Sequence, residues 1–331
     1  MSVPRETNGQ TVPATPELSV VIVVGGQRER AARALRSLID QSFIDRMEIL
    51  LYDLGPEDYP PLAGSDHQHV RLTRLGPRGL LGHARADGVR RAKAPVVAFM
   101  EEHCEMHPGW AETIAMAHRE PWAAVGSQLV NANPKAGVSD AAFRMNYGIY
   151  TRLVVPRGPT TMIPGQNAAY KRDVLLQYEP LLDDIMGADL LLQWKLQQDG
   201  YRMFHEPAVK MAHHNENTFH SLAVGVFYWN WCFASLRARM FKWSLLRRAS
   251  WIALSPLMPL VRLARVSSQV MLKRHIPLLQ FLSDIPFFLG INYCAAAGQL
   301  VGLLGPANHA IKKFSHFEMN EPRLSQAEFC R

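Results

Sequence analysis

The sequence predicts an α/β protein built on a Rossmann-like, mostly parallel sheet that is flanked by helices. Residues 18–24, LSVVIVV, form an uninterrupted and largely β-branched run, which is typical of a strand covered on both faces. Residues 47–53, MEILLYD, form a second apolar run, and the residues between the two runs carry apolar side chains at helical spacing. A strand, a helix and a strand in this order favour a parallel sheet with helices on both faces.

The elements that follow continue this alternation. The first helix has its apolar face at i, i+3, i+4, i+7 and i+8, on Ala31, Ala34, Leu35, Leu38 and Ile39. We expect a third strand at 70–75, a short helix at 82–94 and a fourth strand at 95–100. Residues 121–180 are turn-rich with strand-like pieces, and a helix then begins near Asp189 and stops at Gly200. A short strand and a polar turn follow within residues 208–219.

Acidic residues stand at the ends of two of these strands. Asp53 ends the second strand, and Glu101, Glu102 and His103 end or follow the fourth. Because ligands of open α/β sheets bind beyond the carboxyl ends of the strands, we expect these side chains to share one crevice. Carboxylates at the end of a buried strand need a positive partner, which leaves a metal, a substrate or water as the candidates.

The composition indicates a globular protein and excludes several classes. Hydrophobic residues make up 48% of the 331 residues and charged residues 20%, so the chain can bury a core. Its four cysteines form no CxxC pair, which argues against a disulfide framework or a zinc knuckle and suits a reducing compartment. The sequence has no Walker A loop and no GxGxxG segment, so an NTPase or a dehydrogenase would lack its phosphate cradle.

The C-terminal third has a different charge pattern from the rest of the chain. Of the net charge of +7, residues 221–275 contribute nine Lys and Arg and no Asp or Glu, which leaves −2 for the remainder. Four of the seven tryptophans lie in the same stretch, as in a helix pair at a membrane interface. The alternative is a helical subdomain packed on the sheet, but a solvated face ordinarily mixes both signs of charge. Binding of nucleic acid by this basic region is not expected, because it lacks RNP-type aromatics on a sheet.

Residues 285–305 carry no charge over 21 residues, about the length that spans a bilayer. Asn292, Gln299 and four glycines make this segment a poor spanning helix, so a re-entrant or surface-lying segment is favoured over a span. We therefore expect a peripheral or re-entrant protein on the cytoplasmic side of the inner (plasma) membrane, where anionic lipids attract basic residues.

Six segments in the order of one known family cover roughly residues 18–215. They are LSVVIVVGGQRERAARALRSLIDQSF, EILLYDLGPED, GHARADGVRRAKAPVVAFMEEH, PGQNAAYKRDVL, GADLLLQWKLQQDGYRM and AVKMAHHNE. Through these six segments, the chain resembles the family 2 glycosyltransferases of GT-A fold, of the membrane-associated bacterial type. The resemblance implies a flexible leader at 1–16, a GT-A domain at 17–220 and a membrane-associating helical region at 221–331.

The resemblance also implies which residues hold a nucleotide-sugar donor. Asp53 would accept a hydrogen bond from the N–H of a uracil-like base, although an Asp in a turn can also simply cap it. Arg85 stands where the family has an arginine that can approach phosphate, the alternative being a surface arginine. The sugar or acceptor edge would be lined by Gly165, Gln166 and Asn167, where glycine permits close approach.

Glu101, Glu102 and His103 stand where the family has a DxD motif that holds a divalent cation on the donor diphosphate. The resemblance implies Glu101, His103 and the late His213 as metal ligands, with Mn²⁺ or Mg²⁺ as the ion. Glu101 and Glu102 are also expected to contact the donor, and histidine in the third position shifts the preference toward Mn²⁺ or softer ions. His214 is the alternative if the register differs by one residue, and a solvated acidic loop is the alternative for the whole triplet. Cys104 is interpreted as a filler and not as a nucleophile.

Asp189 is the expected general base, because it matches the aspartate of an ED pair that heads a helix in the family; here Ala188 replaces the glutamate. Asp189 can also be read as the helix N-cap, and Asp183 and Asp184 are its rivals if the register is off by one turn.

Together these residues predict an inverting transfer of a sugar from a nucleotide-sugar donor, UDP-linked, to a saccharide or lipid-linked acceptor in cell-surface glycan synthesis. The competing hypothesis is a catalytically inactive glycosyltransferase-like membrane scaffold, because the DxD motif and the glutamate before Asp189 are both missing.

Overall fold

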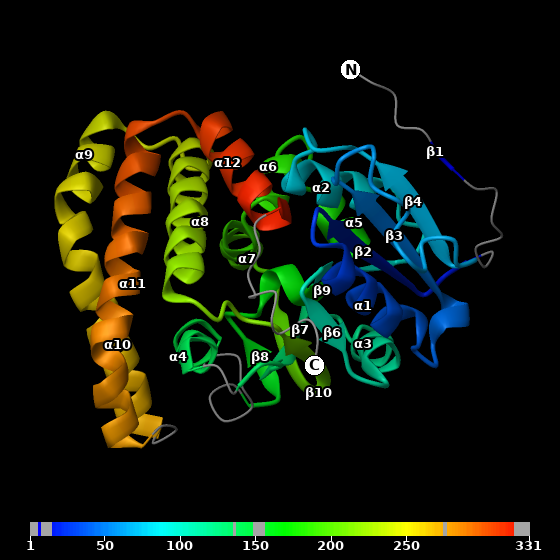
Figure 1. Ribbon diagram of the computed structural model, residues 1–331, viewed down its shortest axis with the longest axis horizontal. Helices are drawn as coiled ribbons and strands as arrows, with labels where there is room; N and C mark the ends of the chain where they lie inside the picture. Colours follow the sequence, from blue (N-terminus) through cyan, green and yellow to red (C-terminus); the bar gives the residue numbers. More distant parts are fainter. Residues whose placement is uncertain (1–5, 8–14, 135–136, 148–155, 274–276, 321–331) are drawn as a thin grey trace. The chain divides into compact units, whose positions relative to one another are not determined.

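The computed structural model describes residues 6–7, 15–134, 137–147, 156–273 and 277–320. It divides into two compact units. The sheet unit comprises residues 1–132, 150–214 and 319–321, and the helical unit comprises residues 133–149, 215–318 and 322–331. Each unit is described by itself below (Figure 1).

The first half of the sheet is parallel, as the alternating pattern predicts. Its order is β4 (Val70–Arg74), β3 (Met47–Asp53), β2 (Leu18–Val24) and β5 (Val96–Glu101). All seven residues of β2 and all seven of β3 are buried, which explains their uninterrupted apolar runs. Within the leader expected at 1–16, β1 (Glu6–Thr7) pairs antiparallel with β4, and its flanks at 1–5 and 8–14 lie outside the described residues.

The second half of the sheet joins the first through β9 (Ala168–Lys171), which runs antiparallel to both of its neighbours. The strands after it are β7 (Ala124–Asn131), the long β10 (Met203–His213) and β6 (Cys104–Met106), and β8 (Gly158–Thr160) pairs with β10 off this path. The longest pairings, β2 with β3 and β10 with β7, are parallel, which confirms the mostly parallel fold class.

Helices cover both faces of the sheet. The connection from β2 through α1 (Arg28–Ile39) moves to β3, while the connection from β4 through α2 (Leu81–Arg91) moves back past β2 to β5. Because such crossovers are right-handed, the two helices fall on opposite faces. Figure 1 shows α1 and α3 (Trp110–Ala117) together on one side, with α2 and α5 (Arg172–Leu176) on the other. Two further helices, α6 (Leu182–Met186) and α7 (Asp189–Gln198), precede β10.

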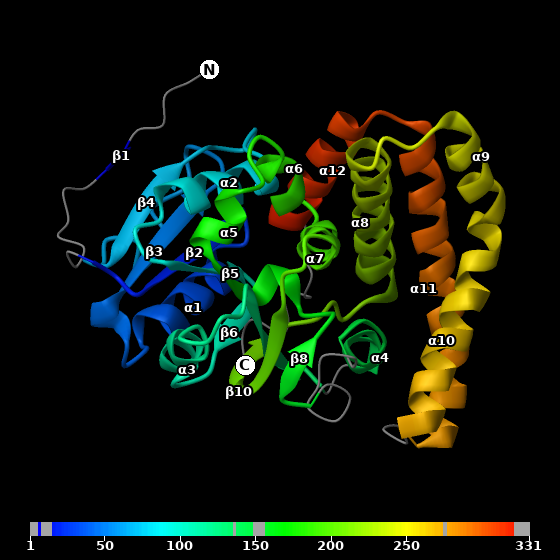
Figure 2. The same cartoon turned by 180° about the vertical axis from the view of Figure 1, so that it is seen from behind.

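The helical unit contains α4 (Gly137–Asn146), α8 (Phe219–Met240), α9 (Leu245–Leu254), α10 (Met258–Lys273), α11 (Leu278–Leu304) and α12 (Ala307–Asn320), the last of which ends in the sheet unit. Figure 2 shows α11 between α8 and the pair formed by α9 and α10. The backbones of α8 and α11 approach closely at Gly298 and Gly302, where an added Cβ would lie 2.2 Å from the Phe227 carbonyl oxygen and 2.4 Å from that of Trp231. Small residues four apart allow this kind of approach.

The helical unit carries polar side chains inside and leucines outside. Its buried polar residues include Asn230, Ser235, Arg237, Ser255, Asn292 and Gln299. Its exposed apolar residues include Leu245, Leu246, Leu254, Leu257, Leu260, Val261, Leu279 and Leu282. Among the described residues, α11 is a helix whose length and composition would suffice to cross a membrane, although 50% of its most apolar window is buried within the protein and Pro286 lies inside it.

Candidate active site

The carboxyl ends of three parallel strands lie side by side and form the floor of the site. In the register of the sheet, Val24 at the end of β2 pairs with Asp53, and Val23 pairs with Glu101 at the end of β5. The loop that begins at Gly25 therefore lies between the two carboxylates. The strand rhythm alone predicted this neighbourhood, because parallel strands of one sheet end at one edge.

Three side chains expected as metal ligands converge at this edge. The Nε2 atoms of His103 and His213 lie 3.1 Å apart, and Oε2 of Glu101 lies 3.3 Å from the first and 3.6 Å from the second. Glu101 comes from the end of β5, His103 from the turn after it, and His213 from the end of β10. The side chains of both histidines are at most 2% exposed and that of Glu101 is 10% exposed.

Two further residues complete this cluster. Asn167 fixes Glu101 from both sides, since its Nδ2 donates to Oε2 at 2.7 Å and its Oδ1 accepts from the Glu101 backbone N–H at 3.0 Å. Cys104 was interpreted as a filler, but the ligand atoms of Glu101, His103, Cys104 and His213 all lie within 4.8 Å of one another. Two imidazoles, a carboxylate and a thiol form a donor set that suits a divalent metal ion.

The charge of Glu101 is stabilised by the two histidines. Burial by itself would raise the pKa of Glu101, but His103 and His213 outweigh it and hold the pKa well below its ordinary value. The carboxylate is thus ionised at neutral pH, which is the form that a metal ligand requires.

Asp189 lines a small pocket with Arg85, Phe99, Gly165, Tyr170, Met186 and Leu192. It is the first residue of α7, one position beyond the N-cap Ala188. Burial raises the pKa of Asp189 to about 6; Arg85 opposes this rise and the negative charge of Glu101 adds to it. A carboxyl group with such a pKa can accept and release a proton near neutral pH.

We call the group of Glu101, His103, Cys104 and His213 the metal-ligand cluster. The short helix η3 (Gly165–Asn167) connects the Asp189 pocket to this cluster. Its last residue, Asn167, holds Glu101, and its first residue, Gly165, lies against Asp189. A Cβ at Gly165 would lie 2.7 Å from Oδ2 of Asp189 and 2.6 Å from Nε2 of Gln193, so only glycine fits there. Gln166 is the middle residue of η3, and its side chain lies outside the described part of the structure.

Glu102 does not join the cluster. Its carboxylate is 1% exposed and accepts hydrogen bonds from the Gly25 backbone N–H at 2.9 Å and from both Nε and Nη2 of Arg30 on α1. Of the two neighbouring glutamates, Glu101 thus points to the histidines and Glu102 fixes the loop after β2.

Asp53 is held at the opposite side of that loop. Its Oδ1 accepts from Nη1 of Arg28 at 2.9 Å and from the Gly55 backbone N–H at 2.9 Å. Arg28 also donates to the Gly25 carbonyl oxygen at 3.4 Å and to the Pro60 carbonyl oxygen at 2.9 Å. Asp53 therefore has both a turn-capping contact and an arginine beside it at the expected donor edge.

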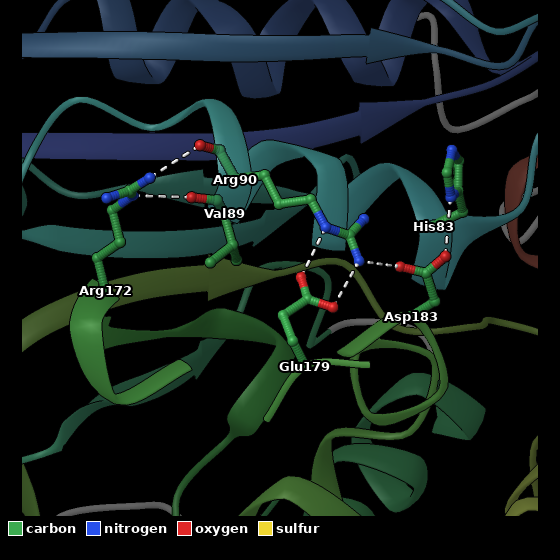
Figure 3. A network of polar contacts seen from close by, with 6 residues as sticks. All are labelled: His83, Val89, Arg90, Arg172, Glu179 and Asp183. Atoms are coloured by element: carbon green, nitrogen blue, oxygen red, sulfur yellow. Dashed lines mark hydrogen bonds and ion pairs between the residues drawn. The ribbon is translucent and has the colours of Figure 1, made fainter. Parts of the chain in front are cut away.

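The register alternatives lie in other contacts. His214 Nε2 lies 2.8 Å from Oε1 of Glu105 and outside the cluster. Figure 3 shows the carboxylate of Asp183 between His83 and Arg90. Arg90 also donates to Glu179, and Arg172 donates to two backbone carbonyl oxygens of α2. Burial would raise the pKa of Asp183, but His83 and Arg90 lower it overall, so this residue is a poor proton acceptor. Asp184 belongs to the same short helix, α6.

Sequence reasoning missed three residues of this region. Cys104 lies at the start of β6, and its place near the histidines depends on the antiparallel pairing of Cys104 with His213. Arg28 and Arg30 lie in the first turn of α1, from which they reach Asp53 and Glu102. The sequence feature that could have indicated Arg28 and Arg30 is the Gly-Gly pair at 25–26 followed by arginines. Such a pair is typical of a loop that packs closely, here against strand-end carboxylates.

Comparisons with known proteins agree with this architecture. The chain is 32% identical over 89 residues to human polypeptide N-acetylgalactosaminyltransferase 15, and 39% identical over 71 residues to the mouse protein. These matches cover 26% and 20% of the chain but only 14% and 11% of the relatives' lengths. A mannosyltransferase from Pyrobaculum calidifontis, PcManGT, solved in complex with GDP-Man and Mn²⁺, superposes with a TM-score of 0.52 over 87% of this chain and 89% of that one. At 15% identity this likeness shows a shared fold.

The profile of the family described as "Glycosyl transferase family 2" matches residues 19–178. The matched stretch contains Asp53, the turn with Glu101 and His103, and the whole of η3. The match covers residues 19–178, and over that part the chain resembles glycosyl transferase family 2, on a sheet of GT-A type.

Proposed function

We propose that this protein catalyses an inverting transfer of a sugar from a nucleotide-sugar donor, UDP-linked, to a saccharide or lipid-linked acceptor in cell-surface glycan synthesis. The observation that carries the proposal is the single short helix η3, which holds Glu101 at the metal-ligand cluster with one end and faces Asp189 with the other. A cation site and a carboxylate with a raised pKa are thereby adjacent, as a sugar transfer requires.

The metal-ligand cluster would hold the divalent cation through Glu101, His103 and His213, with Cys104 as the neighbouring thiol. The donor set fits, because it offers two imidazole nitrogens and an ionised carboxylate close together, and its nitrogen content favours Mn²⁺ over Mg²⁺. When bound, such an ion would neutralise charge on the diphosphate that leaves the sugar. Asn167 keeps the Glu101 carboxylate oriented toward this position.

Asp189 would act as the general base. Its carboxylate takes the proton of the acceptor hydroxyl while that oxygen bonds to the anomeric carbon, and the bond to the nucleoside diphosphate breaks with its electron pair on the departing oxygen. A single displacement of this kind inverts the anomeric configuration. Arg85, which lines the same pocket, supplies positive charge beside the carboxylate and limits the rise of its pKa.

The donor base would lie at the edge formed by Asp53 and the loop after β2. Asp53 is 5% exposed and is held by Arg28 and Gly55, so its carboxylate is oriented before any ligand arrives. The competing hypothesis of an inactive scaffold predicts that no donor is consumed. A screen of sugar nucleotides with Mn²⁺ present, which reads released UDP or GDP, decides between the two; no release from any donor would overturn the enzyme proposal.

The activity should rise with pH through the pKa of Asp189. A base must be ionised to accept a proton, and a carboxyl of pKa about 6 is only about one-tenth ionised at pH 5. At saturating donor and metal, we expect kcat at pH 5 to be about tenfold below its plateau above pH 7. An aspartate of ordinary pKa would give a flat profile over this range, so a flat profile contradicts the assignment.

The helical unit would attach the enzyme to a membrane surface. Leu245 and Leu246 at the start of α9 are 85% and 79% exposed and directly precede Arg247 and Arg248. Exposed leucines beside arginines, with no acid between residues 221 and 275, suit an anionic lipid surface on the cytoplasmic side of the inner membrane.

Replacing both Leu245 and Leu246 with aspartate should weaken binding to phosphatidylglycerol-containing vesicles by at least about tenfold, since each buried leucine contributes about 1.5–3 kcal/mol. Flotation of the full chain with vesicles measures this. Met116→Asp, an exposed apolar residue of the sheet unit, is the matched control and should float as the wild type does. Equal flotation of the double variant and the wild type would remove α9 from the membrane contact.

A further inference from the structure

The helical unit contains a buried arginine that is surrounded by aromatic rings. Arg237 of α8 is 7% exposed, and its Cζ lies 5.3 Å from the ring centroid of Phe233, 4.5 Å from that of Trp243 and 4.7 Å from that of Trp251. The two tryptophan rings are stacked with centroids 5.6 Å apart. Cation–π contacts of this kind offset part of the cost of burying the charge, by about 0.5–2 kcal/mol each.

Within the described part of the chain, no carboxylate pairs with this arginine. Among the hydrogen bonds and ion pairs of the described residues, Arg237 has one side-chain contact, from Nη2 to Oε1 of Gln299 at 3.5 Å. Its charged neighbours are two more arginines: Arg247, whose Cζ lies 4.4 Å from the ring centroid of Trp243, and Arg262, which donates to two asparagine oxygens. Burial, with the positive charges of Arg247 and Arg262, lowers the pKa of Arg237 to about 10.

The hydrogen-bonding groups that lack a partner here are donors. Nε of Arg237 and Nε1 of Trp243 are both buried with no hydrogen-bond acceptor among the described residues. The tryptophan rings lie close to Cζ of the guanidinium but offer it no hydrogen-bond acceptor, and its N–H groups point outward in its own plane. A ligand that completes the cluster must therefore be an acceptor, and the surrounding arginines require that it be negatively charged.

Helix α9 contributes to this cluster and also carries exposed leucines. Trp251 comes from α9, a helix in which none of the ten residues is fully buried. The outer surface of α9 carries the exposed Leu245, Leu246 and Leu254. A guanidinium binds phosphate oxygens in a bidentate geometry, and an apolar surface beside it can accommodate an acyl or isoprenoid chain.

We propose that Arg237, Arg247 and Trp243 form a binding site for a phosphate group, separate from the metal-ligand cluster. The site takes the phosphate of a lipid or a free phosphate anion, with Arg237 at its centre, Arg247 at its rim and the Trp243 indole N–H as a third donor. The proposal does not depend on the glycosyl-transfer proposal, because it rests only on residues of the helical unit.

The test compares three probes on the full chain in non-ionic detergent: dihexanoyl phosphatidic acid, dihexanoyl phosphatidylcholine and inorganic phosphate. Binding is measured by tryptophan fluorescence, to which Trp243 and Trp251 contribute directly, and by the rise in the unfolding temperature. We expect phosphatidic acid to bind to the wild type and Arg237→Gln to bind it at least about tenfold more weakly. Arg239→Gln, an exposed arginine of the same helix that contacts Asn308, is the matched control and should bind within twofold of the wild type.

Each outcome bears on the proposal. Binding of inorganic phosphate as strong as that of phosphatidic acid supports the site and identifies its ligand as a free anion, while preference for phosphatidic acid identifies a lipid phosphate. Equal losses in Arg237→Gln and Arg239→Gln, or equal affinity for phosphatidylcholine and phosphatidic acid, would overturn it. If Arg237→Gln fails to fold, Arg247→Gln, which changes an exposed residue, should still weaken binding several-fold, and a wild type that responds to neither anion refutes the site without any variant.

Discussion

Asp189→Asn is expected to reduce turnover by about 10²–10⁴-fold while leaving donor affinity within a few-fold. The amide has nearly the same shape as the carboxylate, so it fits between Gly165 and Arg85, but it cannot take a proton from the acceptor hydroxyl. Initial rates of UDP or GDP release with and without acceptor give kcat, and calorimetry with the nucleotide gives the affinity. The decrease of kcat below about pH 6 should be absent in the variant.

Asp183→Asn is the matched control for this experiment. It makes the same chemical change six positions earlier, in a residue that pairs with His83 and Arg90 outside the Asp189 pocket (Figure 3). We expect it to lower stability slightly and to leave kcat within about twofold, since exposed ion pairs contribute about 0–1 kcal/mol. Wild-type turnover in Asp189→Asn would remove Asp189 from the mechanism, and a large loss in Asp183→Asn would reassign the base.

His213→Ala is expected to weaken Mn²⁺ binding by at least about 10²-fold and to reduce activity in proportion at limiting metal. The substitution removes one of two imidazole nitrogens that lie 3.1 Å apart and leaves Glu101 with a single histidine. Titration of Mn²⁺ into the protein, followed by electron paramagnetic resonance, measures the affinity directly. Activity as a function of Mn²⁺ concentration should show the same shift.

The adjacent histidine supplies the control. His214 faces Glu105 and lies outside the cluster, so His214→Ala should retain both the metal affinity and the metal dependence of activity. Circular dichroism of both variants separates a local effect from loss of fold, because His213 is fully buried at the end of β10. Unchanged Mn²⁺ affinity in His213→Ala, or an equal loss in His214→Ala, would contradict the metal assignment.

The first half of the sheet could be predicted from the sequence because its signal is local. Buried parallel strands such as β2 and β3 require apolar residues at every position, and α1 requires them at helical spacing. The second half could not be predicted in the same way. β9 pairs antiparallel with both β5 and β7 although it follows them by many residues, and α4 lies in a stretch that the sequence indicates only as turn-rich. Such pairings depend on which distant segments meet, which no local pattern records.

The candidate site, too, has one feature that the sequence predicts and one that depends on tertiary packing. That Asp53 and Glu101 lie at the same edge of the sheet follows from strand rhythm and the rule that parallel strands end together. Successive side chains leave a strand in opposite directions, so only one of Glu101 and Glu102 can face the histidines. The packing of α1 places Arg30 on the side of Glu102, and Glu101 therefore faces the histidines.

By itself, then, the sequence determined the kind of sheet, the resemblance to a known family over residues 19–178 and the chemical types gathered at the strand ends. Only the tertiary structure decided that His213 and not His214 enters the cluster, that Cys104 lies beside it, and that Asp189 and not Asp183 has a raised pKa. The physical reason is that distance, burial and the charge of neighbours set a ligand geometry and a pKa, and each of these depends on residues far away in the chain.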